Sequence, residues 1–384
     1  MSLQDKNDKK GPRKLLALDG GGIRGIMTLE VLDRIESELQ NKLGRDNQFV
    51  LADYFDYIAG TSTGAIIATC LSLGMRVDEV RRFYIESGPA MFDKTNLIRR
   101  YFRNKFHDQQ LAQKLKQVIA EKTGEPEATL GCDRLRTYLL LILRNATTDS
   151  PWPISNNSAS KYNIRTRPVS NLDLPLWQLV RASTAAPTYF PPEVITIRDH
   201  QLNDHEFVFV DGGVTMYNNP AFQLFLMATV APYNLRWPTG QDQMLLVSVG
   251  TGIAADANAN LTPEQMNIVY NASSLPSALM FAASNEQDFL CRVFGNCLNG
   301  GILDREVGDM QGVNGEGPVG PKLFTYMRYN AELSRAGLDA MGLSQIEPRS
   351  VQQMDTVDHI PELQEVGRAV AKEVNIAHFE GFLQ

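Results

Sequence analysis

The fold is decided by one stretch, Ile58-Ala59-Gly60-Thr61-Ser62-Thr63-Gly64-Ala65-Ile66-Ile67. Its apolar ends and central G-x-S-x-G pattern indicate a buried strand, a tight turn and the start of a helix. Gly60 and Gly64 flank Ser62 where a Cβ atom would crowd such a turn. The turn would hold the Ser62 hydroxyl away from the backbone, close to free N–H groups of the helix. This geometry suits a nucleophilic serine, although a polar loop with an N-capping Ser or Thr has the same composition.

A second strand, turn and helix are predicted upstream of this stretch. Residues 14–19 form a short apolar run, and the glycine-rich turn Gly20-Gly21-Gly22-Ile23-Arg24-Gly25 follows it directly. Beyond the turn, apolar residues recur every three or four positions as far as Leu43, which predicts an amphipathic helix ended by Gly44. Two such units in succession predict a parallel sheet with both turns at the C-terminal ends of its strands, where α/β folds bind ligands.

The rest of the chain continues this α/β pattern as far as residue 252. Further strands are predicted at 137–143, 207–210 and 244–249, and further helices at 65–73, 109–122, 173–186 and 220–229. The stretch 147–167 is rich in Ser, Asn and Pro and is predicted to be a surface loop. We therefore expect a flexible N-terminus over 1–13, a catalytic core over 14–252 and a mostly helical part over 253–384 that packs on the same domain.

Composition argues against a nucleic-acid polymer as partner. The chain has 384 residues and a net charge of −7, whereas nucleic-acid binding requires a basic surface. No apolar segment typical of a signal peptide is visible, and no run approaches the roughly 18 apolar residues of a spanning helix. The four cysteines lack C-x-x-C spacing, which indicates reduced thiols rather than a disulfide framework or a zinc site. These features favour a cytoplasmic protein.

One basic stretch is a candidate membrane contact. From Leu97 to Phe106, apolar residues at helical spacing alternate with arginines and lysines. A basic amphipathic helix can lie in a membrane interface, although a core-facing helix with a solvated basic face is the more common cause of such a pattern. The residues that would contact a membrane are Arg99, Arg100, Tyr101, Phe102 and Arg103.

The base for a serine nucleophile has two kinds of candidate. Asp211 ends a predicted strand and precedes two glycines, so we expect it at the same edge of the sheet as Ser62. A buried carboxylate within hydrogen-bond reach of a serine can act as its base when burial raises its pKa, although Asp-Gly also forms ordinary turns. A Ser–Asp–His order would instead use His359 or His378, and both lie in ordinary polar or helical contexts.

The glycine-rich turn has two interpretations. Successive glycines from Gly20 to Gly25 can direct backbone N–H groups at an oxyanion, and Arg24 can orient a phosphate or hold the loop. The alternative is dinucleotide binding, because Gly20, Gly22 and Gly25 fit G-x-G-x-x-G after a strand. That motif requires an acidic residue at the end of a second strand about 20 residues further on. Here this interval is still helix, so we favour the oxyanion hole.

Several blocks of this sequence together resemble the patatin-like phospholipase family. Its three signature blocks correspond to Asp19-Gly20-Gly21-Gly22-Ile23-Arg24-Gly25, Gly60-Thr61-Ser62-Thr63-Gly64 and Asp211-Gly212-Gly213. The stretch 182–192, Asn218-Asn219-Pro220 and Val249-Gly250-Thr251-Gly252 are also similar to the family. The resemblance covers residues 14–252, and the order, spacing and number of the blocks make it specific.

The resemblance implies a three-layer α/β/α fold with a central, mostly parallel sheet, and a lipid acyl hydrolase with a Ser–Asp dyad. Ser62 matches the nucleophile and Asp211 the proton acceptor, and an acyl-enzyme would form on glycerophospholipids without a metal or cofactor. The nucleophile turn corresponds to Gly60 and Gly64. The glycines after the base correspond to Gly212 and Gly213. The oxyanion hole corresponds to Gly20, Gly21, Gly22, Arg24 and Gly25.

The resemblance leaves open the substrate class and the need for an activator. The same dyad can act on soluble esters or thioesters instead of phospholipids. It can also stay silent until an activator binds, as in family members that respond to a host factor or a nucleotide signal, and neither an activator nor a homo-oligomer is specified by the residues. The Asp-Gly-Gly and Asn-Asn-Pro blocks and the missing signal peptide are more similar to intracellular bacterial members than to vacuolar plant proteins, which implies a cytoplasmic location. Peripheral membrane contact would come from the basic stretch at 99–103.

Overall fold

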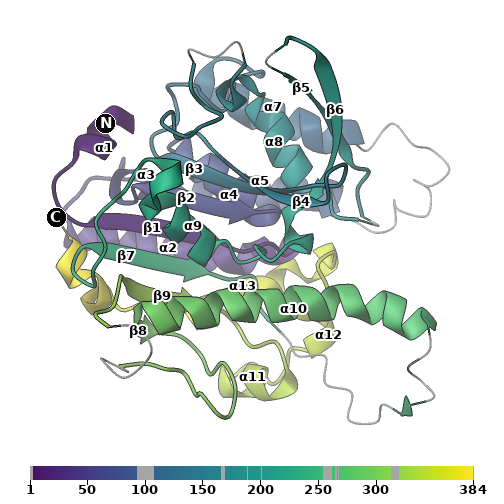
Figure 1. Cartoon of the computed structure of the whole chain (residues 1–384). Helices are drawn as coiled ribbons and strands as arrows, with labels where there is room; N and C mark the ends of the chain where they lie inside the picture. The colour runs from purple at the N-terminus through teal and green to yellow at the C-terminus, as the bar shows by residue number, and fades with distance from the viewer. Residues whose placement is uncertain are drawn as a thin grey trace.

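The computed structural model describes residues 3–92, 108–165, 169–187, 189–199, 201–253, 262–263, 266, 268–312 and 320–383. These residues form an α/β protein on one nine-stranded mixed sheet with helices on both faces (Figure 1). The strands lie in the order β5-β6-β3-β2-β1-β7-β9-β8, and β4 pairs with β3 outside this order. The three-layer α/β/α fold expected from the sequence is confirmed.

The centre of the sheet is parallel and fully buried. Strand β1 (Arg13–Leu18) lies between β2 (Tyr57–Thr61) and β7 (Met244–Val249), and all three run in the same direction. Every residue of these three strands is buried, because helices cover both faces of the sheet. Continuous burial explains why the three strands appear in the sequence as apolar runs rather than as alternating patterns.

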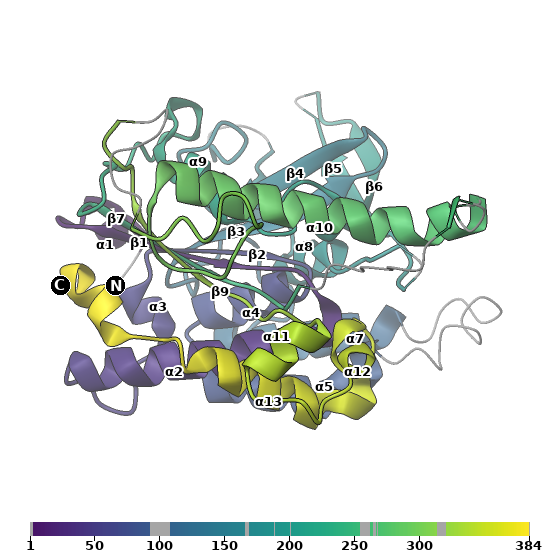
Figure 2. The ribbon, with the colours of Figure 1, turned by 90° about the horizontal axis from the view of Figure 1, so that it is seen from below.

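Two separate apolar cores lie on the two faces of the sheet, because alternate residues of β1 point to opposite sides. Leu16 and Leu18 belong to one core, and Leu15 and Ala17 belong to the other. Figure 2 shows the helices that cover the two faces of the sheet. The first core is covered by α2 (Gly25–Lys42), α3 (Leu51–Tyr54), α4 (Thr63–Ser72), α5 (Val77–Phe92), α7 (Asp108–Thr123), α8 (Leu176–Ser183) and α13 (Ile360–Ala371). The second core is covered by α9 (Ala221–Thr229) and α10 (Ile268–Phe294).

One side of the sheet differs from the sequence prediction. The segment 147–167 is not only a surface loop, because it contains β4 (Ser150–Ser155), which pairs antiparallel with β3 (Tyr138–Asn145). Two prolines in β4 masked this strand in the sequence, and they are tolerated because β4 lies outside the main strand order. A further strand, β5 (Glu193–Arg198), was not predicted.

Strand β6 (Asp204–Asp211) runs antiparallel to both of its neighbours, β3 and β5. Asp211 still lies near the C-terminal end of β3, because β6 overlaps only Leu143 to Asn145 of that strand. The expectation that Asp211 lies at the same edge as Ser62 is therefore correct in position. The parallel direction behind that expectation is wrong.

The C-terminal part supplies strands as well as the predicted helices. Strands β8 (Asn296–Asn299) and β9 (Thr325–Tyr329) extend the sheet beyond β7. The short helices α11 (Arg335–Ala340) and α12 (Pro348–Gln352) precede α13, which packs along α2. The same sheet thus contains strands from before and after residue 252. The domain division proposed at that position stays a prediction.

The N-terminal segment contains a helix where a flexible segment was expected. Helix α1 (Leu3–Asp8) lies at the N-terminal edge of the sheet, and its Lys6 side chain is buried. The candidate membrane contacts at 99–103 lie outside the described residues, so that prediction is untested. Among the helices that are described, none combines the length and the hydropathy needed to cross a bilayer.

Candidate active site

Ser62 lies in a strained turn between β2 and α4. Its backbone has φ 55° and ψ −121°, with the positive φ that residues carrying a side chain rarely adopt. A Cβ atom at Gly60 would overlap the Gly64 carbonyl oxygen, and one at Gly64 would overlap the Leu18 carbonyl oxygen. Both positions therefore require glycine, as the sequence predicts.

The structure brings Ser62 and Asp211 into direct contact. Ser62 Oγ donates a hydrogen bond of 2.6 Å to Asp211 Oδ2, and the Gly213 N–H donates to Asp211 Oδ1 at 2.6 Å. Asp211 is only 4% exposed, and this burial raises its pKa from 3.8 to about 6, against the opposing effects of Ser62, Gly213 and Arg181. A carboxylate with this pKa can accept the serine proton near neutral pH.

The short segment from Ser183 to Ala185, at the C-terminal end of α8, holds both members of this pair. The Ser62 N–H donates to Ser183 Oγ at 3.0 Å, and that hydroxyl donates to the Ile142 carbonyl at 2.7 Å. Two residues later, the Ala185 carbonyl accepts the Asp211 N–H at 3.0 Å. The sequence marked this segment only as a block of the resemblance, because its partners lie on distant strands.

The glycine-rich turn is fixed by bonds to two distant segments. The Gly20 N–H donates to the Asn218 carbonyl at 3.1 Å, and the Ile23 N–H donates to the Met354 carbonyl at 2.9 Å. The second bond comes from the chain after α12, so the C-terminal part directly supports the turn. Gly25 begins α2, where a Cβ atom would lie 2.6 Å from Thr63 Oγ1.

Two N–H groups of the turn are free to bind a ligand. In the part of the chain that the structure describes, neither the Gly21 N–H nor the Gly22 N–H has an acceptor. Gly22 has a φ of 61°, and a Cβ atom at Gly21 would overlap Thr251 Oγ1, so both positions depend on glycine. A pair of free backbone donors beside a serine is the arrangement that an oxyanion hole requires.

Arg24 lies beside these donors and makes only carbonyl contacts among the described residues. Its Nε donates to the Gly21 carbonyl at 3.4 Å, and its terminal nitrogen donates to the Gln352 carbonyl at 3.2 Å. Burial lowers its pKa to about 10, which still leaves the guanidinium charged at neutral pH. Arg24 can therefore hold the loop and still attract an anion.

A buried ion pair that the sequence did not reveal lies under the turn. Arg328 on β9 contacts Asp19 through both terminal nitrogens, at 2.9 and 2.5 Å, and also donates to Ser248 Oγ at 2.7 Å. Arg328 lies on β9, Ser248 lies on β7, and Asp19 directly follows β1. The ion pair and its bond to Ser248 therefore join three adjacent strands. Arg328 carries no local motif, and only the folded sheet places it beside Asp19.

A cavity of about 410 Å³ opens beside the glycine-rich turn. Gly20 lines this cavity and is next to the nucleophile, since a Cβ atom at Gly20 would lie 3.2 Å from Ser62 Cβ. Its lining includes Gly20, Arg24, Tyr189, Asn218, Phe281 and Ser284. The wall is thus polar near the turn and partly apolar along α10.

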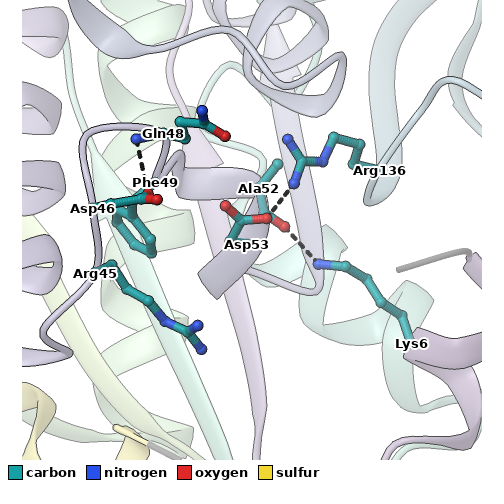
Figure 3. A pocket seen from close by; sticks show the side chains of 8 residues that line it. All are labelled: Lys6, Arg45, Asp46, Gln48, Phe49, Ala52, Asp53 and Arg136. Atoms are coloured by element: carbon teal, nitrogen blue, oxygen red, sulfur yellow. Dashed lines mark hydrogen bonds and ion pairs between the residues drawn. The ribbon is translucent and has the colours of Figure 1, made fainter.

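A second cavity, of about 420 Å³, lies at the N-terminal edge of the sheet, where the parallel strands β2 and β3 begin (Figure 3). Lys6 Nζ donates to the Ala52 carbonyl at 2.8 Å and to the Phe55 carbonyl at 2.5 Å, while Arg136 pairs with Asp53. These bonds tie α1 and the start of β3 to α3. Because its central charged groups are engaged in bonds within the protein, this cavity is not the candidate catalytic site.

The histidine alternative receives no support from the geometry. Within the described residues, His359 pairs with Glu362 at 3.0 Å, and neither His359 nor His378 is hydrogen-bonded to Ser62 or Asp211. Among all the residues that the structure describes, no group of three or more His, Cys, Asp or Glu side chains is placed to hold a metal ion.

The fold and this site define an α/β protein with a serine on a strand-to-helix turn and a carboxylate bonded to it. The family model described as "Patatin-like phospholipase" matches residues 16–225, more than half of the chain. The chain belongs to the patatin-like phospholipase family, as the sequence blocks predicted. Membership in this family implies a hydrolase and supports lipid acyl hydrolase activity.

Similar proteins include plant patatins and two proteins with solved structures. Patatin-T5 of Solanum tuberosum is 28% identical over 315 residues, covering 74% of this chain and 77% of that protein. Patatin-17 of Solanum cardiophyllum is 29% identical over 263 residues, covering 65% and 63%. The human GIVD cytosolic phospholipase A2 structure gives a TM-score of 0.47 at 10% identity, over 99% of this chain and 62% of that one. VipD from Legionella pneumophila gives 0.38 at 14% identity, over 93% and 67%.

Proposed function

We propose that this protein is a phospholipase A-type enzyme that cleaves fatty-acyl esters of glycerophospholipids. The observation that carries the proposal is the 2.6 Å hydrogen bond from Ser62 Oγ to Asp211 Oδ2, in a chain that belongs to a phospholipase family. In this proposal Ser62 is the nucleophile and Asp211 the proton acceptor. No step requires a histidine, a metal or a cofactor.

Acylation begins when Ser62 Oγ attacks the ester carbonyl carbon and its proton passes to Asp211 Oδ2. The carbonyl oxygen becomes an oxyanion that accepts hydrogen bonds from the Gly21 and Gly22 N–H groups. The tetrahedral intermediate then collapses, the bond to the lysolipid oxygen breaks, and that oxygen takes the proton back from Asp211. The product of this half-reaction is an acyl ester on Ser62.

Deacylation repeats the same steps with water. Asp211 accepts a proton from a water molecule as the water oxygen attacks the acyl carbon, and the oxyanion returns to the Gly21–Gly22 site. Collapse breaks the bond to Ser62 Oγ, which regains its proton from Asp211, and the fatty acid leaves. Asp211 is well suited to both transfers, because its pKa of about 6 lies close to the working pH.

The polar cavity beside the turn suits the glycerophosphate part of the substrate. Arg24 lines this cavity, is charged at neutral pH and has carbonyl groups rather than a carboxylate as described partners. A phosphate near Arg24 would hold the ester carbonyl over Ser62. We further propose a cytoplasmic enzyme that contacts membranes peripherally, with residues 99–103 as one candidate contact.

The first test labels the nucleophile directly. A fluorophosphonate ester, which modifies activated serines, should add to Ser62 in the wild type, and digestion with mass spectrometry should locate the adduct. Labelling should increase as the pH rises through about 6, because Asp211 must be deprotonated to accept the proton. Labelling of another serine, or labelling that does not depend on Asp211, would contradict the dyad.

The second test identifies the substrate class. The proposal predicts faster fatty-acid release from long-chain phospholipid vesicles than from a short soluble ester or thioester at equal concentration. A preference for the soluble compounds would support a soluble-ester hydrolase with the same dyad. Labelling of Ser62 without turnover of any substrate would favour an enzyme that needs an activator.

A further inference from the structure

The Asn218 side chain is an unusual feature of the cavity wall. Asn218 is 8% exposed and lines the cavity beside the glycine-rich turn, and its Nδ2 donates to Ser284 Oγ at 3.2 Å. Among the described residues its Oδ1 has no hydrogen-bond partner. A buried amide oxygen without a donor destabilises the folded state, so a side chain left in this state indicates a missing partner.

The amide end of Asn218 lies beside two glycines that are next to the nucleophile and the base. A Cβ atom at Gly20 would overlap Asn218 Oδ1 and lie 3.2 Å from Ser62 Cβ. A Cβ atom at Gly213 would lie 2.8 Å from the same Oδ1 and 3.0 Å from Asp211 Oδ1. The glycines at these two positions leave a small space that the amide shares with Ser62 and Asp211.

Rotating the amide by 180° gives the Asn218 oxygen a donor and turns the NH₂ group toward Ser62. An amide oxygen and an amide NH₂ have nearly the same size, so the rotation preserves the packing. The Ser284 hydroxyl can then donate to Oδ1, because a hydroxyl both donates and accepts. The NH₂ group then faces the space beside Ser62 and Gly20, where an oxygen would accept its hydrogen bond.

We propose that the Asn218 amide is a third oxyanion donor, beside the N–H groups of Gly21 and Gly22, and that Ser284 holds it in the donating orientation. This inference rests on the proposed function. The backbone supports it, because the Gly20 N–H donates to the Asn218 carbonyl at 3.1 Å and fixes this residue to the turn. Asn218 acts on the reacting oxygen, whereas Ser284 is a positioning residue.

Two substitutions at Asn218 separate a donor from an acceptor. Asn218→Asp keeps the oxygen and removes the NH₂ group, and Asn218→Ala removes both. With a short-chain phospholipid kept below its micelle concentration, both variants should lower kcat by about 100- to 1000-fold, the usual cost of losing one oxyanion donor. KM should change little, because the bond forms only as charge develops on the oxygen. The loss in Asn218→Asp should persist at pH 9, since it comes from the missing donor and not from a shifted Asp211 pKa.

The matched control is Asn145→Asp, the same change at another buried asparagine, outside the cavity. Asn145 is 5% exposed and its Oδ1 accepts the N–H groups of Thr147 and Thr148 at 3.0 and 3.1 Å, two bonds that a carboxylate preserves. It should keep the wild-type kcat, and the thermal unfolding of all variants should be compared. Ser284→Ala should lower kcat about tenfold, because the amide stays but loses its orientation.

The inference is overturned if a folded Asn218→Asp enzyme keeps kcat within threefold of wild type, because its oxygen would then be the functional group. It is also overturned if Asn218→Ala and wild type have the same kcat. Ser62→Ala is measured in the same assay. Turnover that survives in Ser62→Ala would refute the proposed dyad itself, a different failure from retention in the Asn218 variants alone.

Discussion

The polar groups at the C-terminal and N-terminal edges of the central sheet differ in whether they have partners within the protein. At the C-terminal edge, Ser62 has a positive φ, Asp211 has a raised pKa, and the Gly21 and Gly22 N–H groups have no described acceptor. At the N-terminal edge, Lys6 and Arg136 beside the second cavity are bonded to carbonyl groups or to an opposite charge (Figure 3). Both edges contain charged groups, but those of the C-terminal edge surround a cavity with donors left for a ligand.

This difference indicates that the C-terminal edge is the functional one. Strain and unsatisfied donors reduce stability, so they persist where a ligand completes them. The paired charges of the other edge hold α1, α3 and β3 together and gain nothing from a ligand. Substitutions at Arg328, Asp211, Ser183 and Arg136 test this difference between the two edges.

The largest loss of stability is expected from Arg328→Met. Asp19 would stay buried without its cation, which typically costs about 3–5 kcal/mol. Urea unfolding measures this difference. The double variant Asp19→Asn/Arg328→Met is the control, because it removes both charges and should recover part of the loss. A double variant less stable than the single one would show that the ion pair is not the main contribution.

Asp211→Asn should increase stability while it removes turnover. The pKa of Asp211 rises from 3.8 in the unfolded chain to about 6 in the folded protein, so the folded state binds the proton more tightly. Wild-type stability should therefore fall as the pH rises from about 4 to 6, by up to about 3 kcal/mol, and then level off. The neutral amide of the variant carries no such penalty. The unfolding temperature of the variant should be higher than that of wild type at pH 8 and equal to it below pH 4. A higher unfolding temperature for wild type at pH 8 would contradict this prediction.

Ser183→Ala should affect both stability and rate, whereas Ser72→Ala should affect stability alone. Both serines are fully buried and hydrogen-bonded, and Ser72 accepts from Thr137 at the far end of α4. Each change should cost about 1–3 kcal/mol. Only Ser183→Ala releases the Ser62 backbone, so only this variant should lower kcat, by about 10- to 100-fold. Equal kcat values for the two variants would remove Ser183 from the positioning of the nucleophile.

The smallest effect is expected from Arg136→Gln at the N-terminal edge. Its ion pair with Asp53 is more than a third exposed on both sides, so its loss should cost no more than about 1 kcal/mol. The kcat should equal that of wild type, as measured on the same phospholipid. A clear fall in kcat would mean that the second cavity is coupled to the active site. It would contradict the claim that only the C-terminal edge takes part in turnover.

The sequence predicted the parts of the site that are set by local constraints. Gly60 is required by a backbone contact within its own turn and Gly64 by the Leu18 carbonyl of the adjacent strand, while the apolar runs of β1, β2 and β7 follow from burial on both faces. The position of Asp211 at the sheet edge was also correct. Each of these features is accompanied by a short motif or an apolar run, so each leaves a pattern in the sequence.

Features that depend on distant partners left no such pattern. The direction of β6 follows from the connection through β4 and β5, and the prolines of β4 hid that connection. Strands β8 and β9 are short and separated by a long glycine-rich segment. The roles of Ser183, Asn218 and Arg328 depend on contacts with residues far away in the chain. The sequence blocks pointed to the first two positions, but not to what these side chains contact.

The most direct test of the central claim is fatty-acid release from phospholipid vesicles by four proteins: wild type, Ser62→Ala, Asp211→Asn and the double variant His359→Ala/His378→Ala. The account predicts release by wild type and by the histidine double variant, and at least a 10,000-fold loss, on the order of that seen when a catalytic nucleophile or its partner is removed, in the other two. Loss of release in a folded histidine double variant, or release retained by Ser62→Ala, would contradict the Ser62–Asp211 dyad.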